Sequence, residues 1–176
     1  MKRTIELPEN VEAEKVDGAI LIKGEDENVE KKLNHPLIAV DCDHDKITVE
    51  TKKENKKTRS IARTFESKLR SAVKGVQENF EYKLKVVYKH FPMEAKVQGN
   101  KLVVSNFLGE KMNREADILE GVKVKVQDEH ITVTGADKER AGQTAANIER
   151  NMQAPNKKDR RVFEDGIYIV EKPSGD

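Results

Sequence analysis

Apolar residues recur at helical spacing in two stretches of the chain. In the first half they fall at offsets 0, 1, 4, 8, 11, 12 and 15, which is one stripe at the 3.6-residue period of a helix with a single buried face. The stripe consists of Ile61, Ala62, Phe65, Leu69, Ala72, Val73 and Val76. Gly75 lies near its end, where a C-capping glycine is expected.

The second stripe is shorter. Its residues fall at offsets 0, 4, 7 and 11, and they are Ala141, Ala145, Ile148 and Met152. Asp137 is the expected N-cap, because its carboxylate can accept a hydrogen bond from a backbone N–H of the first turn. Pro155 limits further extension, since proline lacks an N–H and its ring clashes with the preceding turn. The pattern therefore predicts one helix in each half.

Alternation of apolar and polar residues predicts strands between these helices. Two segments, residues 82–88 and 122–127, place apolar side chains on one face and mainly lysine on the other. The apolar faces are formed by Tyr82, Leu84, Val86 and Tyr88 in one segment and by Val122, Val124 and Val126 in the other. A sheet with one buried and one wet face is typical of antiparallel pairing.

The two halves repeat one pattern. The apolar runs at 16–22 and 45–49 recur at 97–104 and 129–133, so that Val16 and Val97 are 81 positions apart and Ile47 and Ile131 are 84 apart. The difference of about three residues between these two spacings fits insertions in surface loops. A repeat of about 80 residues is longer than the repeats of a solenoid. The pattern favours a duplicated domain, with coincidence between two generic patterns as the alternative.

Each half has several short strands and one long helix, which is too few helices for alternating β-α-β units. We therefore predict an α+β fold, a tandem duplication of a small domain in which antiparallel strands pack on one long helix. The predicted domains are residues 1–80 and 81–176, with the boundary near residues 78–82.

Charge is abundant and unevenly distributed. Of the 176 residues, 37% are charged, yet the net charge is only +1, whereas a nucleic-acid binder is usually more basic. Residues 10–30 are acidic, while residues 52–74 and 157–161 are basic. Because binding depends on the local field of a patch, the near-neutral total does not exclude a polyanionic partner.

Cys42 is the only cysteine, which excludes an internal disulfide and fits a reducing compartment. The first twenty residues carry many charges, so we expect no signal peptide, and no apolar run approaches the roughly 20 residues that span a bilayer. A soluble cytoplasmic protein without a membrane partner is the expectation.

Catalytic and metal-binding patterns are weak. Cys42 lies between two aspartates, which would raise the pKa of its thiol, and a turn between strands is the favoured interpretation of that stretch. Histidines at 35, 44, 90 and 130 show no metal-ligand spacing, and the isolated glycines form no phosphate loop. We predict no catalytic residue, no metal and no cofactor.

Cations gather just before the C-terminal apolar run. Four of the five positions 157–161 are basic, namely Lys157, Lys158, Arg160 and Arg161. The run that follows, opened by Asp165 and Gly166, would hold these cations in place, with Val162, Phe163, Ile167 and Ile169 as anchors. Charges that are ordered before binding are suited to phosphate recognition.

Two other polar groups are candidates for the same role. Asn147, Arg150 and Asn151 lie on the polar side of the second helix and offer amide and guanidinium donors, with a solvated helix face as the alternative. The cations at 52, 53, 56, 57 and 59 precede the first helix and equally fit a solvated loop.

Three motifs carry a family resemblance: Asn-Phe-Leu-Gly-Glu-Lys at 106–111, Gln-Thr-Ala-Ala-Asn-Ile-Glu at 143–149, and Lys-Asp-Arg-Arg-Val-Phe-Glu-Asp-Gly-Ile-Tyr at 158–168. Together they resemble the archaeal and eukaryotic branch of the large-subunit ribosomal protein six family. The resemblance runs from residues 4–8 to Lys172, and its most specific motif is the last one.

The resemblance implies a duplicated α+β fold, no enzymatic activity, and binding to 23S-type rRNA of the large subunit near the sarcin–ricin loop and the factor-binding site. It implies that the second domain binds RNA and that the first faces neighbouring ribosomal proteins at the stalk base, with one copy per ribosome. The RNA-binding residues carried over are Lys111, Arg114, Asn147, Arg150, Asn151, Lys157, Lys158, Arg160 and Arg161. Residues 106–114 fit a structural hairpin as well as an RNA-binding loop.

Two rival functions remain open at this point. A non-ribosomal adaptor could use its acidic N-terminal half to bind a basic protein, which the near-neutral net charge favours. An enzyme centred on Cys42 or His90 is the other rival.

Overall fold

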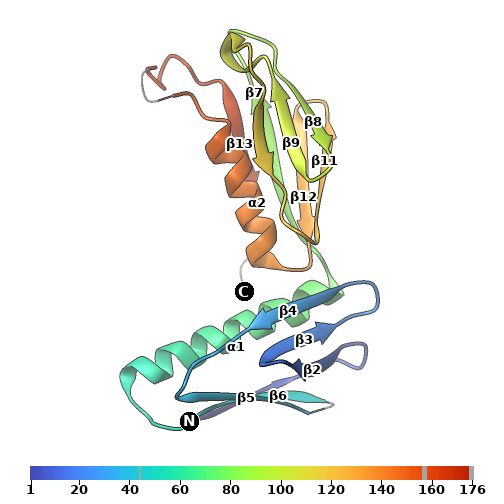
Figure 1. Ribbon diagram of the computed structural model, residues 1–176, viewed down its shortest axis with the longest axis vertical. Coiled ribbons are helices and arrows are strands. Elements are labelled where there is room, and N and C mark those ends of the chain that lie inside the picture. The colour runs from blue at the N-terminus through green and yellow to red at the C-terminus, as the bar shows by residue number, and fades with distance from the viewer. Residues whose placement is uncertain (44, 156–157, 175–176) are drawn as a thin grey trace. The chain divides into compact units, whose positions relative to one another are not determined.

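The computed structural model describes residues 1–43, 45–155 and 158–174. It confirms the predicted α+β class: two helices and four antiparallel sheets form two compact units, Met1–Asn79 and Phe80–Asp176 (Figure 1). Each unit has its own core and is described by itself.

The first unit contains two three-stranded sheets and one helix. One sheet has the order β1-β6-β5 and the other has the order β2-β3-β4, with all pairs antiparallel. The bounds are β1 Lys2–Glu6, β2 Glu12–Val16, β3 Ala19–Lys23, β4 Asn28–Lys32, β5 Ile38–Asp43, β6 Lys46–Thr51 and α1 Lys56–Gln77. Cys42 therefore lies in a strand, not in the turn that the sequence favoured.

Helix α1 extends beyond the predicted stripe at both ends. It begins at Lys56, because the Asn55 side chain accepts a hydrogen bond from the Thr58 N–H and the Thr58 hydroxyl accepts one from the Asn55 N–H. Three of the cations assigned to a preceding loop therefore lie in the helix. Gly75 is not the predicted C-cap, since the helix continues to Gln77 and buries Val76.

The second unit repeats this arrangement and adds a strand. Its sheets have the orders β11-β12-β7-β13 and β10-β9-β8, and α2 and both sheets share one apolar core (Figure 1). The bounds are β7 Phe80–Val87, β8 Glu94–Gln98, β9 Lys101–Ser105, β10 Arg114–Asp117, β11 Val122–Gln127, β12 His130–Gly135, α2 Lys138–Asn151 and β13 Gly166–Glu171, with a short 3-10 helix at Phe107–Gly109. Asp137 caps α2 as predicted, by accepting from the Glu139 N–H.

The repeat is visible in the pairing. β6 lies between β1 and β5 in the first unit, as β12 lies between β7 and β11 in the second, and a β-hairpin meander, β2-β3-β4 or β8-β9-β10, completes each copy. This common order confirms the predicted duplication. Strand β13 has no counterpart among the described strands of the first unit.

Strand β13 pairs with the outer edge of β7 and turns it into an internal strand. Tyr82, Leu84 and Val86 of β7 are buried as predicted, whereas Tyr88 lies beyond the strand and is exposed. We call residues 158–163 the basic segment. This segment lies in the chain between α2 and β13, so the pairing of β13 with β7 fixes the end of the segment that follows its cations.

Candidate nucleic-acid interface

The segment from Lys158 to Phe163 is folded into turns. The Lys158 N–H donates to the Pro155 carbonyl over 2.9 Å, and the N–H groups of Val162 and Phe163 both donate to the Asp159 carbonyl, over 3.0 and 2.8 Å. The Asp159 carboxylate also accepts from the Arg161 N–H over 2.9 Å. The cations of this segment are therefore mounted on ordered backbone.

Two arginines of this segment point into solvent. Arg160 and Arg161 are exposed, and the Arg161 side chain retains 93% of its accessible surface. Lys158 is half-buried, with its ammonium 4.8 Å from the centre of the Phe163 ring, a cation–π contact that fixes the lysine stem. Lys157 lies outside the described residues, so its predicted role stays a prediction.

A buried carboxylate holds the segment to the second unit. The fully buried side chain of Asp165 accepts hydrogen bonds from the N–H groups of Lys89 and His90, over 3.1 and 3.2 Å, and lies 2.8 Å from Nδ1 of His90. The His90 ring in turn packs against Phe163, with ring centres 4.9 Å apart. We call Asp165 and His90 the Asp-His clamp. It joins the start of β13 to the loop after β7.

The clamp changes the acidity of Asp165. Burial raises the pKa of this carboxyl, but the His90 ring and the two backbone N–H groups together lower it below its ordinary value. A carboxyl with a lowered folded-state pKa contributes stability above its unfolded-state pKa and loses it as pH falls through the folded-state value.

We therefore expect the stability advantage of the wild-type protein over Asp165→Asn to shrink progressively as the pH falls below about 5. Urea denaturation of both proteins from pH 7 to pH 2 measures it. A difference in unfolding free energy that does not change with pH would contradict the role assigned to the ionised carboxylate.

Glycine is required at the start of β13. A Cβ on Gly166 would lie 2.6 Å from the Met152 carbonyl oxygen, which accepts a hydrogen bond from the Ile167 N–H over 3.2 Å. A further bond joins the Ile169 N–H to the Glu149 carboxylate of α2 over 3.0 Å. Strand and helix thus approach backbone to backbone.

The predicted anchors divide into three that pack and one that does not. Ile167 is fully buried, and Phe163 and Ile169 pack partly buried against the core. Val162 is 56% exposed, so its predicted anchoring role is wrong. It lies in the turn closed by the Asp159 carbonyl, ahead of the residues that reach the core.

Arg114 connects the loop before β10 to the end of α2. Its guanidinium donates to the carbonyls of Asn151 and Gln153 over 2.9 and 2.8 Å and to both carboxylate oxygens of Glu110 over 2.7 and 2.8 Å. It also lies 3.9 Å from the centre of the buried Phe107 ring. With these contacts, Arg114 positions the loop.

The acidity of Glu110 reflects the cations around it. The hydrogen bond from Arg114 is the main cause that lowers the pKa of Glu110, partial burial opposes it, and the charges of Arg114 and Lys158 lower it further. Arg114 thus joins the loop to the end of α2, and the segment follows that helix in the chain.

The remaining predicted residues lie on the loop and on α2. Lys111 and Arg150 are exposed. Asn147 is half-buried and accepts from the Gln143 amide over 2.9 Å, while the exposed Asn151 donates to the Glu115 carbonyl over 3.1 Å. We define the basic surface as Lys111, Arg150, Lys158, Arg160 and Arg161, with the two asparagines as neighbouring amides.

Sequence reasoning missed two features of this surface. The first is the Asp-His clamp, whose partners are 75 positions apart and give no local signal. The second is Met112, which is 82% exposed in the loop before β10 next to Lys111. An apolar residue inside a polar loop was the signal that could have drawn attention to it.

The structure gives little support for a reactive cysteine or for a metal site. Cys42 is half-buried, and burial, with a smaller contribution from Asp41, raises the pKa of its thiol despite the opposing charge of Lys15. Within residues 1–43, 45–155 and 158–174, no cluster of three or more potential metal ligands occurs. Over the same residues, no helix is long and apolar enough to cross a membrane.

Comparison with known families decides the identity. The family description ribosomal protein L6 matches residues 7–79 and 91–166, one segment in each unit. The chain belongs to the ribosomal protein L6 family. The resemblance inferred from the sequence is thereby confirmed, and the two matched segments agree with the duplicated units of the fold.

Archaeal members of the ribosomal protein L6 family are similar to this chain along almost its whole length. The large ribosomal subunit protein uL6 of Methanococcus vannielii is 41% identical over 172 residues, which cover 98% of this chain and 94% of the relative. Those of Haloarcula marismortui and Methanosarcina mazei are 42% and 43% identical over 170 residues, covering 97% of this chain and 95% and 96% of the relatives.

Membership of the ribosomal protein L6 family gives the chain a structural role in the large subunit of the cytoplasmic ribosome, and not an enzymatic one. This agrees with the prediction that no residue is catalytic.

Proposed function

We propose that the second unit binds large-subunit rRNA through the basic surface and that Arg160 and Arg161 make its central phosphate contacts. The observation that carries this proposal is the exposure of both arginines on a turned segment whose far end is fixed by the buried Asp165. Because the backbone that carries these cations is ordered before binding, less conformational entropy is lost and more of the contact energy appears as affinity.

The chemistry of the surface matches folded RNA. Duplex RNA hides its major groove and presents phosphates and 2′-hydroxyls, which proteins recognise with donors held in fixed positions. Arginine forks form paired hydrogen bonds to a phosphate, and lysines act as point charges beside them. The amides of Asn147 and Asn151 offer donors and acceptors for sugars or base edges.

Three predicted residues have modified roles in this proposal. Arg114 contributes by holding the loop against α2, because its guanidinium is engaged with Glu110 and the end of the helix. Lys111 and Arg150 contribute exposed cations from the loop before β10 and from α2. Lys157 adds a positive charge by its place in the sequence.

The proposed rRNA site is the region of the sarcin–ricin loop and the factor-binding site, with the first unit facing neighbouring proteins at the stalk base and one copy in each ribosome. The family assignment and its near full-length similarity to archaeal uL6 proteins support this location.

A salt titration of binding to a large-subunit rRNA fragment tests the proposal. We expect Arg160→Ala with Arg161→Ala to reduce the slope of log K against log salt by about two and to weaken binding by about ten- to hundredfold near 0.1 M salt. The matched control is Lys85→Ala with Lys125→Ala, which removes two exposed cations from strands of the same unit.

An unchanged slope in the arginine variant would remove Arg160 and Arg161 from the interface. An equal loss in the lysine control would show that any two charges suffice. If tRNA competes for the wild-type protein as effectively as the rRNA fragment does, the basic surface is a generic binding patch for polyanions.

A further inference from the structure

The two units differ at one sheet edge. In the second unit the outer edge of β7 is covered by β13, and in the first unit the equivalent strand β1 ends its sheet, with β6 as its neighbour. Within the described residues no other strand pairs with β1. By analogy with β7 and β13, the uncovered edge of β1 is suited to pair with a further strand.

The equivalence can be fixed residue by residue. The Leu7 N–H donates to the Asp45 carbonyl over 2.9 Å, and at the matching place the Val86 N–H donates to the Glu129 carbonyl over 2.7 Å. Counting back along each strand aligns Ile5 with Leu84. Leu84 is the residue that pairs with Ile169 of β13, with Lys85 opposite Tyr168, and after a register shift Lys83 lies opposite Glu171.

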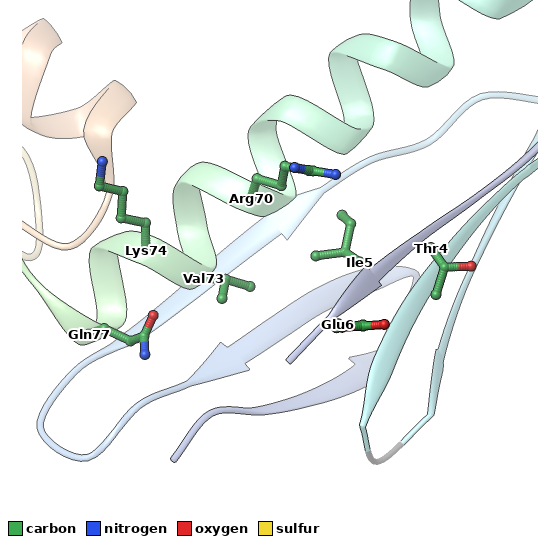
Figure 2. A pocket seen from close by; sticks show the side chains of 7 residues that line it. All are labelled: Thr4, Ile5, Glu6, Arg70, Val73, Lys74 and Gln77. Atoms are coloured by element: carbon green, nitrogen blue, oxygen red, sulfur yellow. The ribbon is translucent and has the colours of Figure 1, made fainter. Parts of the chain in front are cut away.

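A groove lies at this position. It has a volume of about 380 Å3 and is formed between β1 and the last turns of α1 (Figure 2). Its lining residues are Thr4, Ile5 and Glu6 from the strand and Arg70, Val73, Lys74 and Gln77 from the helix. Ile5 and Val73, both buried, make its floor, and the polar residues form its rim.

The backbone of β1 is oriented for another strand. Residues Met1 and Leu7 hydrogen-bond toward β6, so by strand alternation Arg3 and Ile5 do the same, and Thr4 and Glu6 direct their N–H and carbonyl groups to the outer edge. An unpaired row of this kind is a template for an extended chain.

The positive charge of helix α1 favours a binding partner with acidic side chains. Helix α1 carries seven lysines and arginines and a single glutamate, and two of the cations, Arg70 and Lys74, line the groove. An incoming strand with acidic side chains on the rim side would therefore be attracted. RNA fits less well, because the outer edge of β1 offers alternating backbone N–H and carbonyl groups, which pair with a polypeptide backbone.

We propose that this groove binds an extended acidic segment of a protein partner, which pairs antiparallel with β1 as β13 pairs with β7. The segment places an apolar side chain opposite Ile5, where β13 places Ile169 opposite Leu84, and carboxylates beside Arg70 and Lys74. The first unit thereby becomes a protein-binding module, a function separate from the RNA contacts proposed for the second.

The test uses the full chain, labelled with 15N, and a seven-residue capped peptide that places glutamate, isoleucine and glutamate at alternate positions on one face, with threonine at the positions between them. We expect amide shifts confined to β1 and the last two turns of α1. Arg70→Gln with Lys74→Gln should weaken the peptide about five- to tenfold, because each exposed charge pair contributes modestly. Lys56→Gln with Lys57→Gln, at the other end of the helix, is the charge-matched control and should leave affinity unchanged.

A second variant tests strand pairing apart from charge. Thr4→Pro removes an N–H that faces the outer edge and leaves the pairing with β6 intact, a position where a strand tolerates proline. We expect at least about a tenfold loss of peptide binding. If this variant does not fold, the glutamine variants still decide the question.

Three results would overturn the proposal: no shifts in β1 or α1, shifts there that are equally strong when lysine replaces glutamate in the peptide, or equal peptide affinity in Thr4→Pro. An RNA oligonucleotide that occupies the same residues and displaces the peptide at lower concentration would assign the groove to nucleic acid instead.

Discussion

Replacing Asp165 with alanine is expected to open the end of β13 and to weaken RNA binding although the residue touches no RNA in our proposal. The substitution leaves the N–H groups of Lys89 and His90 without their buried acceptor. Because hydrogen bonds to a buried charge are among the strongest in a protein, we expect a loss of about 3 kcal/mol in the local stability of this region.

Hydrogen exchange of the Lys89, His90 and Ile167 amides measures that loss, with exchange rates rising by about a hundredfold. We expect rRNA affinity to fall about tenfold, because Arg160 and Arg161 must then be ordered during binding. The salt slope should stay near its wild-type value, since all cations remain. A weaker affinity with an unchanged salt slope distinguishes a residue that positions the arginines from a residue that contacts RNA.

Glu164→Ala is the matched control. It removes the neighbouring carboxylate, which is exposed and pairs with Lys89 at the surface, so the effect on exchange should be below about 1 kcal/mol. If Asp165→Ala and Glu164→Ala behaved alike, the Asp-His clamp would have no special role.

Gly166→Ala should be as damaging as the loss of Asp165, and for a steric reason. The new methyl group would lie 2.6 Å from the Met152 carbonyl oxygen and 3.1 Å from the Tyr168 hydroxyl. The carbonyl belongs to the backbone and accepts from Ile167, so it cannot move without breaking the junction of α2 and β13. We expect a destabilisation of about 3 kcal/mol, at the upper end of overpacking effects.

Gly99→Ala is the control for this substitution. Gly99 has a φ of +61° and open space around its missing Cβ, so alanine there meets only backbone strain of about 1 kcal/mol. Urea denaturation of both variants compares the two costs. A Gly166→Ala protein as stable as Gly99→Ala would show that the strand and the helix have room to separate.

Periodicity gave the two helices, the buried face of β7 and the duplication, because each depends on residues near in sequence and on one repeating contact with the core. Asp137 could be predicted as a cap for the same reason. The N-terminal extension of α1 was missed, since apolar spacing carries no information on the first turn and the signal lay in Asn55 and Thr58.

The candidate site was only partly predictable. The cations of the basic segment are evident from composition, but what holds them is not, because Asp165 and His90 meet across 75 positions. Val162 illustrates the limit: an apolar residue beside Phe163 reads as core, and the turn at Asp159 directs it into solvent. Likewise, the hydrogen bonds from Arg114 to the end of α2 join residues 37 and 39 positions apart and give no local signal.

The position of β13 at the end of the chain has a consequence for synthesis. All strands and the helix of the first unit are available once residue 79 has been translated, so this unit can fold while the rest is being made. In the second unit, β7 begins at Phe80 but waits for a strand that ends at Glu171. A chain interrupted before β13 therefore has a folded first unit and no fixed arginines, and only a chain translated past Glu171 can engage the proposed rRNA site.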